Sequence, residues 1–170
     1  MLGLDETGFL KTGRHAAGVA RQSSGPAGKV DHGQIGVFLS DASPLGQVRR
    51  DRERSLPQEW TDDRERCRQA GLPEGRRVAT KPPLAQLMLA RAFAAGVPAH
   101  WVTGDSICGH NRRLRLGLAA QPQAYVLAVS GQEYVWLHGR QRQVTTLVAT
   151  LPADGWTRLR AGDGAKGPRW

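Results

Sequence analysis

The stretch ATKPPLAQLMLARAFAAGVPAHWVTGD, from Ala79 to Asp105, carries the clearest structural signal in this 170-residue sequence. Apolar residues recur in its first half at the spacing of one helix face: Leu84, Leu87, Met88, Ala92 and Ala95. Gly96 and Pro98 then end the pattern, as is typical at the end of a helix. The next residues, His100 to Thr103, indicate a buried strand that leads into Asp105. A helix followed by a strand and an acidic residue is therefore expected here.

Upstream of this unit, three short segments are predicted to be strands that pair antiparallel in succession. They are Met1 to Leu4, Ala16 to Gln22 and Gln34 to Ser40, the last with apolar residues at alternate positions. From Gln47 to Arg77 the sequence is polar, rich in arginine and interrupted by prolines. We expect a long surface excursion there, with one or two helical turns near Thr61 to Ala70.

Downstream, a second helix is predicted from Arg112 to Ala120 and a further strand from Ala124 to Val129. The resulting order is three strands, helix, strand, helix, strand, which indicates an α/β fold with a mixed sheet whose strand-helix-strand units are parallel. This is the order of a ribonuclease H-like core. We expect a partial core over residues 1–130, incomplete at both ends, because the first apolar segment is too short for an ordinary strand. Residues 131–170 are expected to be irregular or to form short strands.

The charge balance favours a polyanionic partner. There are 24 lysines and arginines against 15 aspartates and glutamates, a net charge of +9, and each phosphate that a cation neutralises releases counterions. The alternative is that runs such as Arg49 to Arg54 are only a solvated surface. No apolar run is long enough to cross a bilayer and no leader is visible, so a cytoplasmic protein is expected. Cys67 and Cys108 lack metal-site spacing and are expected to be reduced thiols.

Two aspartates are candidate metal ligands because each is predicted to lie at the end of a strand. Asp5 follows the first strand and Asp105 the fourth, and neighbouring strand ends can bring carboxylates together. Paired carboxylates suit magnesium, a hard cation that prefers oxygen ligands. The alternative is that Asp5 caps a turn and Asp105 caps the following helix. Spacing alone favours the caps.

Several linked stretches resemble one family in the same order along nearly the whole chain. They are DETGFLKTG (5–13), GVARQSSGPAGK (18–29), QIGVFLSDASPLG (34–46), LPQEWTDD (56–63), ATKPPLAQLMLARAFAAGVPAHWVTGD (79–105), YVLAVSGQEYVW (125–136) and GWTRLRAGDGAKGPRW (155–170). The family is the DDE-superfamily endonuclease domain of bacterial transposases, in the group named after insertion sequence 701. Motifs linked in this way are far more specific than any one of them.

The resemblance implies a catalytic triad of two aspartates and a glutamate that holds two Mg²⁺ or Mn²⁺ ions for DNA cleavage and strand transfer. The first aspartate falls on Asp5, which would bridge both metals, and the second on Asp105, which would hold one. No residue takes the place of the glutamate, so this chain is expected to be a catalytic-domain fragment that is incompetent alone. The alternative is that one of the later acids, Glu133, Asp154 or Asp163, reaches the site. Ser23 and Cys108 depart from the family, which usually has an aromatic residue and a tyrosine at these positions.

The resemblance further implies double-stranded DNA at transposon ends as the partner, and a homodimer as the form usual in the family. Lys11, Arg21 and Lys29 are the candidate DNA contacts, because the two lysines flank glycine-rich turns near Asp5 and Arg21 lies on the second strand. Solvated side chains are the alternative. The alternative function is a non-catalytic DNA-binding remnant or accessory protein of a degenerate insertion sequence.

Other motifs point to no further chemistry. Trp60 could stack on a base, but a tryptophan in a polar segment more often pins a loop to the core. Ser106 begins like a nucleophile elbow in GDSIC, yet Cys108 stands where the second glycine belongs. The pair Gly28 and Lys29 lacks the remaining residues of a phosphate-binding loop. A serine hydrolase and a nucleotide-binding protein are therefore not indicated.

Overall fold

The computed structural model describes residues 1–13, 16–24, 29–75, 77, 79–157, 163–164 and 167–168. The chain divides into two compact units, Met1–Val129 and Ser130–Trp170, and each is described by itself.

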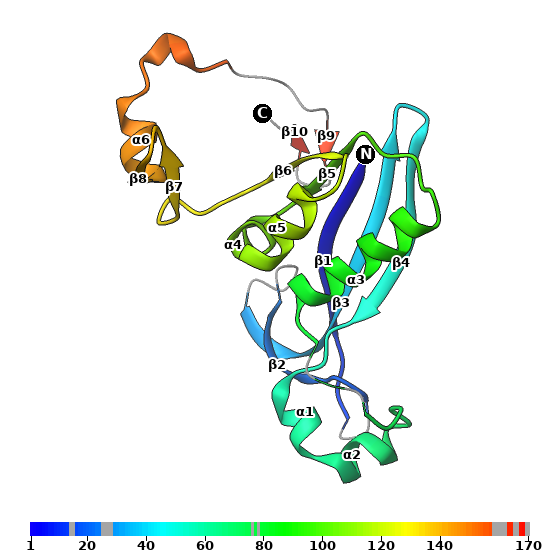
Figure 1. The fold of residues 1–170 in the computed structure, drawn as a ribbon. Coiled ribbons are helices and arrows are strands. Elements are labelled where there is room, and N and C mark those ends of the chain that lie inside the picture. Colours follow the sequence, from blue (N-terminus) through cyan, green and yellow to red (C-terminus); the bar gives the residue numbers. More distant parts are fainter. Residues whose placement is uncertain are drawn as a thin grey trace. The chain divides into compact units, whose positions relative to one another are not determined.

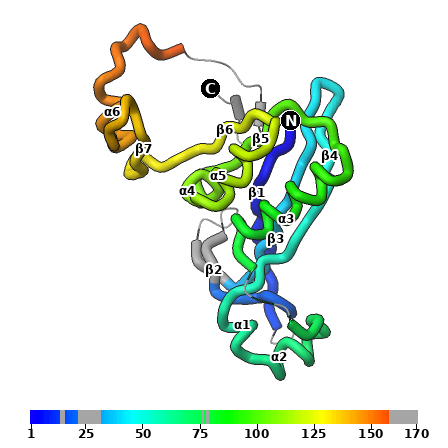
Figure 2. The backbone as a smooth tube through the Cα atoms, in the orientation of Figure 1, coloured from blue at the N-terminus to red at the C-terminus, as the bar shows by residue number. Residues whose placement is uncertain are grey.

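The first unit is built on one mixed sheet (Figure 1). Its strands are β1 (Leu2–Leu10), β2 (Ala20–Ser24), β3 (Lys29–Ser43), β4 (Gly46–Arg54), β5 (Trp101–Gly104) and β6 (Ala124–Leu127). The strand order is β2-β3-β1-β5-β6, and β4 pairs with β3. β1 is antiparallel to β3 and parallel to β5, while β5 is parallel to β6. Figure 2 shows the backbones of β5, β1, β3 and β4 side by side. The α/β fold expected from the sequence is confirmed, with parallel strand-helix-strand units as in a ribonuclease H-like core.

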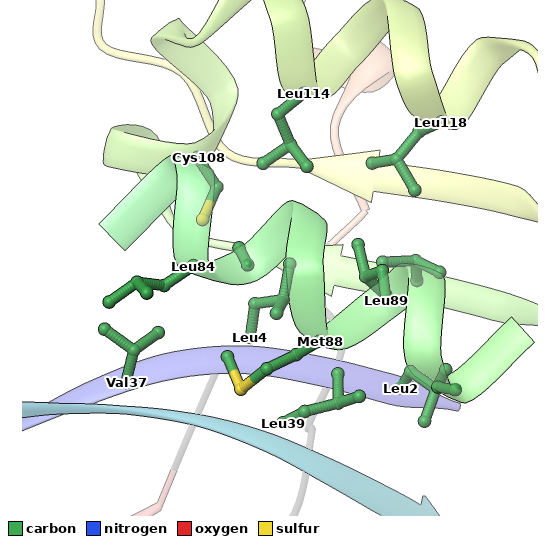
Figure 3. Packing of buried hydrophobic residues seen from close by; sticks show 13 residues of the cluster. Leu2, Leu4, Val37, Leu39, Leu84, Met88, Leu89, Cys108, Leu114 and Leu118 are labelled. Atoms are coloured by element: carbon green, nitrogen blue, oxygen red, sulfur yellow. The ribbon is translucent and has the colours of Figure 1, made fainter. Parts of the chain in front are cut away.

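In the described residues of this unit the strands are connected by the helices α1 (Gln58–Asp62), α2 (Arg64–Gln69), α3 (Lys81–Ala94), α4 (Ser106–His110) and α5 (Arg112–Ala119). The longest, α3, lies along one face of the sheet (Figure 3). Its Leu84 and Met88 pack with Leu4 and Leu39 from the strands in the main core cluster. Burial of these side chains stabilises the unit by about 1.5–3 kcal/mol each.

The buried face of α3 differs in part from the expected one. Leu84, Met88 and Ala92 are buried as predicted, but the side chain of Leu87 is 44% exposed. The core side of the helix is completed instead by Ala85 and Leu89, which lie on the other flank of Met88 at 3.6 residues per turn. Ala95 is exposed because the helix ends at Ala94.

The strands also differ from the prediction, mainly in four places. β3 runs from Lys29 to Ser43 and not from Gln34 to Ser40, because β1, β2 and β4 all pair with it. β1 continues to Leu10, because it pairs with β3 over nine residues, so Asp5 lies inside a strand and not at its end. The second strand begins only at Ala20, and it pairs with the first part of β3. The first three strands therefore do not pair in succession as expected, because β3 lies between β1 and β2. Residues 46–54 form a strand, β4, where a surface excursion was expected. Its side chains alternate in charge and not in hydropathy, which conceals the period of two.

Trp60 pins its segment to the core, as predicted. Its side chain is fully buried, its indole N–H donates to the carbonyl of Val19 at 2.8 Å, and the Arg66 guanidinium lies 3.9 Å from its ring centre. Trp60 forms a second small core with Leu56 and Cys67. Cys67 and Cys108 are both free and buried, in agreement with the expected reduced thiols.

The second unit contains the hairpin β7 (Tyr134–Leu137) and β8 (Arg140–Gln143), followed by α6 (Val144–Thr150), a 3-10 turn at Ala153–Gly155 and the two-residue strands β9 (Asp163–Gly164) and β10 (Gly167–Pro168). The hairpin turn requires positive φ at both central residues, His138 at 49° and Gly139 at 74°. In the described part of the chain, no helix combines the length and apolar character that a membrane span needs.

Candidate active site

The register between β1 and β5 brings the backbones of the two predicted site residues side by side. Leu2 pairs with Val102 and Leu4 with Gly104 in the parallel ladder. Asp5 and Asp105 are the next residues on each strand. Adjacent strands lie about 4.8 Å apart, so the two aspartates flank the position where β5 ends and β1 continues toward Leu10.

Asp5 lies on the face of the sheet away from α3. Leu2 and Leu4 point into the core beneath α3, and successive side chains of a strand alternate between faces. The Asp5 side chain is exposed, and its carboxylate accepts a hydrogen bond from the Glu6 backbone N–H at 2.8 Å. The alternative role for Asp5, a turn cap, is wrong because no turn follows it.

Asp105 caps α4, as the alternative role for this residue required, but it also forms a second interaction. One carboxylate oxygen, Oδ1, accepts from the Cys108 backbone N–H at 3.2 Å, and the other, Oδ2, lies 2.7 Å from Nζ of Lys81. The Asp105 side chain is 41% exposed, whereas that of Lys81 is only 3% exposed. One side of the carboxylate is therefore held by the protein and the other is open to solvent.

Lys81 is the residue of this site that the sequence does not predict. It is the first residue of α3 and one of two buried polar residues in the described part of the chain. Both circumstances disfavour an ammonium group, since burial removes its hydration and the N-terminus of a helix carries partial positive charge. Within the described residues, Asp105 is its one hydrogen-bond partner. A lysine directly before two prolines at a helix start was the only sequence signal available.

The charges around Asp105 shift two pKa values. Partial burial opposes ionisation of Asp105, but hydrogen bonds from the Lys81 ammonium and the Cys108 N–H outweigh it and hold the pKa of Asp105 below its usual value. Burial raises the pKa of the Cys108 thiol to about 11, and the negative charge of Asp105 opposes its ionisation further. Asp105 is thus ionised and Cys108 is a neutral thiol at neutral pH.

The donor chemistry at this edge of the sheet fits a hard divalent cation. Asp105 supplies oxygen ligands, since each of its oxygens accepts one protein hydrogen bond and retains a further lone pair. Asp5 leaves the adjacent strand toward the face away from α3, so the register brings the two backbones together but gives no contact between the two carboxylates. Among the described residues, no group of three or more His, Cys, Asp or Glu side chains is placed to hold a metal. Two acids and a nearby ammonium would bind a cation only weakly.

Of the three basic residues predicted to contact DNA, the two with described side chains, Lys11 and Arg21, do not gather at the aspartates. Lys11 is exposed just after β1, and its backbone N–H donates to the carbonyl of His32. Arg21 is exposed on β2 opposite the same histidine. Lys11 lies six residues beyond Asp5, about 20 Å along an extended chain. Lys29 pairs with Ser24 in the sheet, and its side chain lies outside the described residues.

Comparison with known proteins gives two findings. The sequence model of the family described as DDE superfamily endonuclease matches residues 1–153. A curated relative, the probable transposase for insertion sequence element IS701 of Microchaete diplosiphon, is 28% identical over 145 residues, which cover 81% of this chain and 34% of the relative. The chain thus spans about a third of the length of that relative. No solved structure matches.

Proposed function

Because this chain belongs to the DDE superfamily of endonucleases, we propose that it is part of the catalytic domain of a transposase, with DNA at transposon ends as its substrate. Asp5 and Asp105 are the proposed metal-binding acids. The proposal rests chiefly on the register of β1 and β5, in which the two aspartates follow paired residues on adjacent strands. Such a protein would act in the bacterial cytoplasm, where the DNA is.

Endonucleases of this superfamily generally depend on divalent metal ions. A bound Mg²⁺ or Mn²⁺ would activate the attacking oxygen and stabilise charge on the phosphate. In the proposed site Asp5 and Asp105 would hold the cation, and α4 and Lys81 fix the orientation of the Asp105 carboxylate. Because positioning supplies much of the rate in phosphoryl transfer, a fixed carboxylate is more useful than a mobile one.

We further propose that a polypeptide of these 170 residues binds metal weakly and does not cut DNA. Two acids leave a second ion poorly held, and no residue of the chain matches the third acid of the family. The second unit, Ser130–Trp170, would then correspond to the beginning of an inserted region.

Titration with Mn²⁺, followed by electron paramagnetic resonance, tests the site directly. The wild-type chain is expected to bind Mn²⁺ weakly, and Asp5→Asn and Asp105→Asn are each expected to reduce this binding strongly. Glu74→Gln is a matched control, because Glu74 is exposed and makes no described contact. Equal binding by all four proteins would overturn the proposed site.

Incubation with supercoiled DNA and Mg²⁺ or Mn²⁺ tests the activity. No nicking above the level of Asp105→Ala is expected. Nicking by the wild-type chain that disappears in Asp105→Ala would contradict the proposed incompetence and would show that another acid completes the site.

One observation favours a second candidate function, a DNA-binding remnant without catalysis. The Lys81 ammonium lies 2.7 Å from Asp105 and neutralises its charge. In a site that no longer binds metal, such an ammonium group would take the place of the metal ion. The two functions predict different Mn²⁺ titrations, because a remnant would show no difference between the wild-type chain and Asp105→Asn.

A further inference from the structure

Strand β4 separates its charges between the two faces of the sheet. Asp51 pairs with Leu39 and Glu53 with Val37, and both partners point into the core beneath α3. Alternation of side chains then places Arg52 on the opposite face. Its neighbour on β3 is Phe38, which itself pairs with Asp5 of β1.

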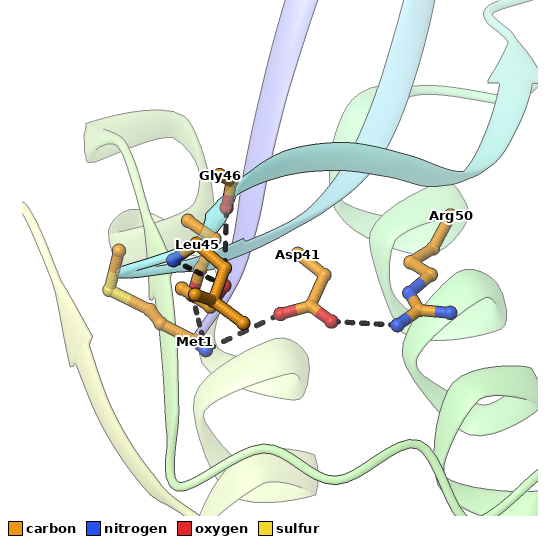
Figure 4. Close-up of polar contacts among 7 residues, drawn as sticks. Met1, Asp41, Leu45, Gly46 and Arg50 are labelled. Atoms are coloured by element: carbon orange, nitrogen blue, oxygen red, sulfur yellow. Dashed lines mark hydrogen bonds and ion pairs between the residues drawn. The ribbon is translucent and has the colours of Figure 1, made fainter.

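The acidic residues of β4 are neutralised on the α3 side. Arg91 of α3 binds Asp51 at 2.7 Å and Glu53 at 2.8 Å. Arg50, next to the irregularity in the β3–β4 pairing, binds Asp41 of β3 at 3.0 Å (Figure 4). The acids closest to β4 therefore already have basic partners.

Three arginines of β4 remain exposed on the other face. They are Arg49, Arg52 and Arg54, and none of them forms an ion pair with a described residue. The Arg49 guanidinium lies 4.6 Å from the centre of the Phe38 ring, which fixes both groups on the same face.

The register places these arginines in line with residues of β1, with β3 between the two strands. Asp5, Phe38 and Arg52 form one row across β1, β3 and β4. Thr7, Gly36 and Arg54 form the row two residues further along. Each arginine therefore stands two strands from β1, about 10 Å between backbones at 4.8 Å per strand.

The same face is hollowed beside these residues. A groove of about 620 Å³ is lined by Phe9, Gly36, Phe38, Arg52 and Arg54, among others. The absence of a side chain at Gly36 leaves space in the groove, because a Cβ at this position would crowd the rings of Phe9 and Phe38. The groove thus combines aromatic rings with two guanidinium groups that have no acidic partner among the described residues, and Glu53, which also lines it, is paired with Arg91.

We propose that Arg49, Arg52 and Arg54 form a binding surface for the phosphate backbone of DNA, on the face of the sheet that carries Asp5. This inference rests on the proposed function and adds to it the path of the DNA. A guanidinium donates to two phosphate oxygens at once, and Phe38 supplies a face on which a base or sugar can pack. Binding at this surface should not depend on the base sequence, because its contacts are to the phosphate backbone of the DNA.

DNA fits this surface better than a protein segment does. A covering helix or strand would have to remove three guanidinium groups from water and supply an acid for each of them. Phosphates supply negative charge at regular intervals, and they remain partly hydrated when bound.

The test compares two triple variants of the full chain that lose the same charge. Arg49→Gln, Arg52→Gln and Arg54→Gln remove the proposed surface. Arg112→Gln, Arg113→Gln and Arg140→Gln remove three exposed arginines elsewhere. Fluorescence anisotropy with a labelled duplex of arbitrary sequence gives the affinity of each protein between about 50 and 200 mM salt.

If all three arginines contact phosphates, the slope of log affinity against log salt should fall by about 2.7 in the first variant, and each lost contact should weaken binding roughly eightfold at about 0.1 M salt. The control should change much less. Equal slopes and affinities in the two variants would overturn the inference and leave the proposed function standing. No binding by the wild-type chain would overturn both. A large fall in melting temperature confined to the first variant, with an unchanged slope, would instead assign the arginines to protein packing and refute the inference.

Discussion

Asp105→Ala is expected to destabilise the fold much more than Lys81→Met, although the two side chains form one ion pair. The reason is their unequal burial, with 3% of the Lys81 side chain exposed against 41% for Asp105. Removal of the acid leaves a buried ammonium without a partner. Removal of the lysine leaves a carboxylate that water can hydrate, and methionine fills a similar volume.

The magnitudes follow from these two situations. Breaking a fully buried pair costs about 3–5 kcal/mol, which we reduce to about 2 because water reaches the Asp105 side of this pair. Loss of the cap on α4, where Asp105 accepts from Cys108, adds about 1 kcal/mol. Asp105→Ala should therefore lower the free energy of unfolding by about 3 kcal/mol, and Lys81→Met by at most about 1 kcal/mol.

Urea unfolding followed by far-ultraviolet circular dichroism measures the four proteins of a double-mutant cycle. The double variant lacks the buried ammonium that Asp105→Ala leaves without a partner, so it should be more stable than Asp105→Ala alone. The coupling energy between the two substitutions should be about 2 kcal/mol. Asp105→Asn keeps the cap and should fall between wild type and Asp105→Ala. Additive effects, or a loss in Lys81→Met equal to that in Asp105→Ala, would refute the reasoning.

Three further outcomes are expected. The pKa of Asp105 is lowered in the folded state, so ionised Asp105 stabilises the fold fully at pH values above its unfolded pKa of about 3.9. As the pH falls below this value, the difference in free energy of unfolding between wild type and Lys81→Met, measured by urea unfolding, should shrink. Cys108, with its pKa raised by burial to about 11, should react with iodoacetamide at about pH 8 far more slowly in the folded chain than in urea, and comparable rates would contradict its burial. Gly109→Ala should cost about 3 kcal/mol, because its Cβ would overlap a backbone carbonyl after β6. The control, Gly117→Ala, has room for a methyl group and should be neutral or stabilising by up to about 1 kcal/mol in melting experiments.

Local patterns were sufficient to predict α3, α5, β5 and β6, because each has an apolar period or a clear end signal in its own residues. They failed at β4, whose alternation is one of charge sign. They also misplaced the end of β1, because a strand continues as long as a partner supplies hydrogen bonds, and β3 is that partner. A partner strand far along the chain leaves no mark in the local sequence.

The sequence by itself determined the α/β order, the excess of positive charge, and Asp5 and Asp105 as the candidate acids. Only the tertiary structure decided that the two aspartates follow the paired residues Leu4 and Gly104, that Lys81 is buried against Asp105, and that the arginines of β4 share a face with Asp5. The physical reason is that residue type and period fix what one segment can form alone. Register, burial and ion pairing depend on which distant segments pack together, and those contacts join residues that are 24 to 100 positions apart.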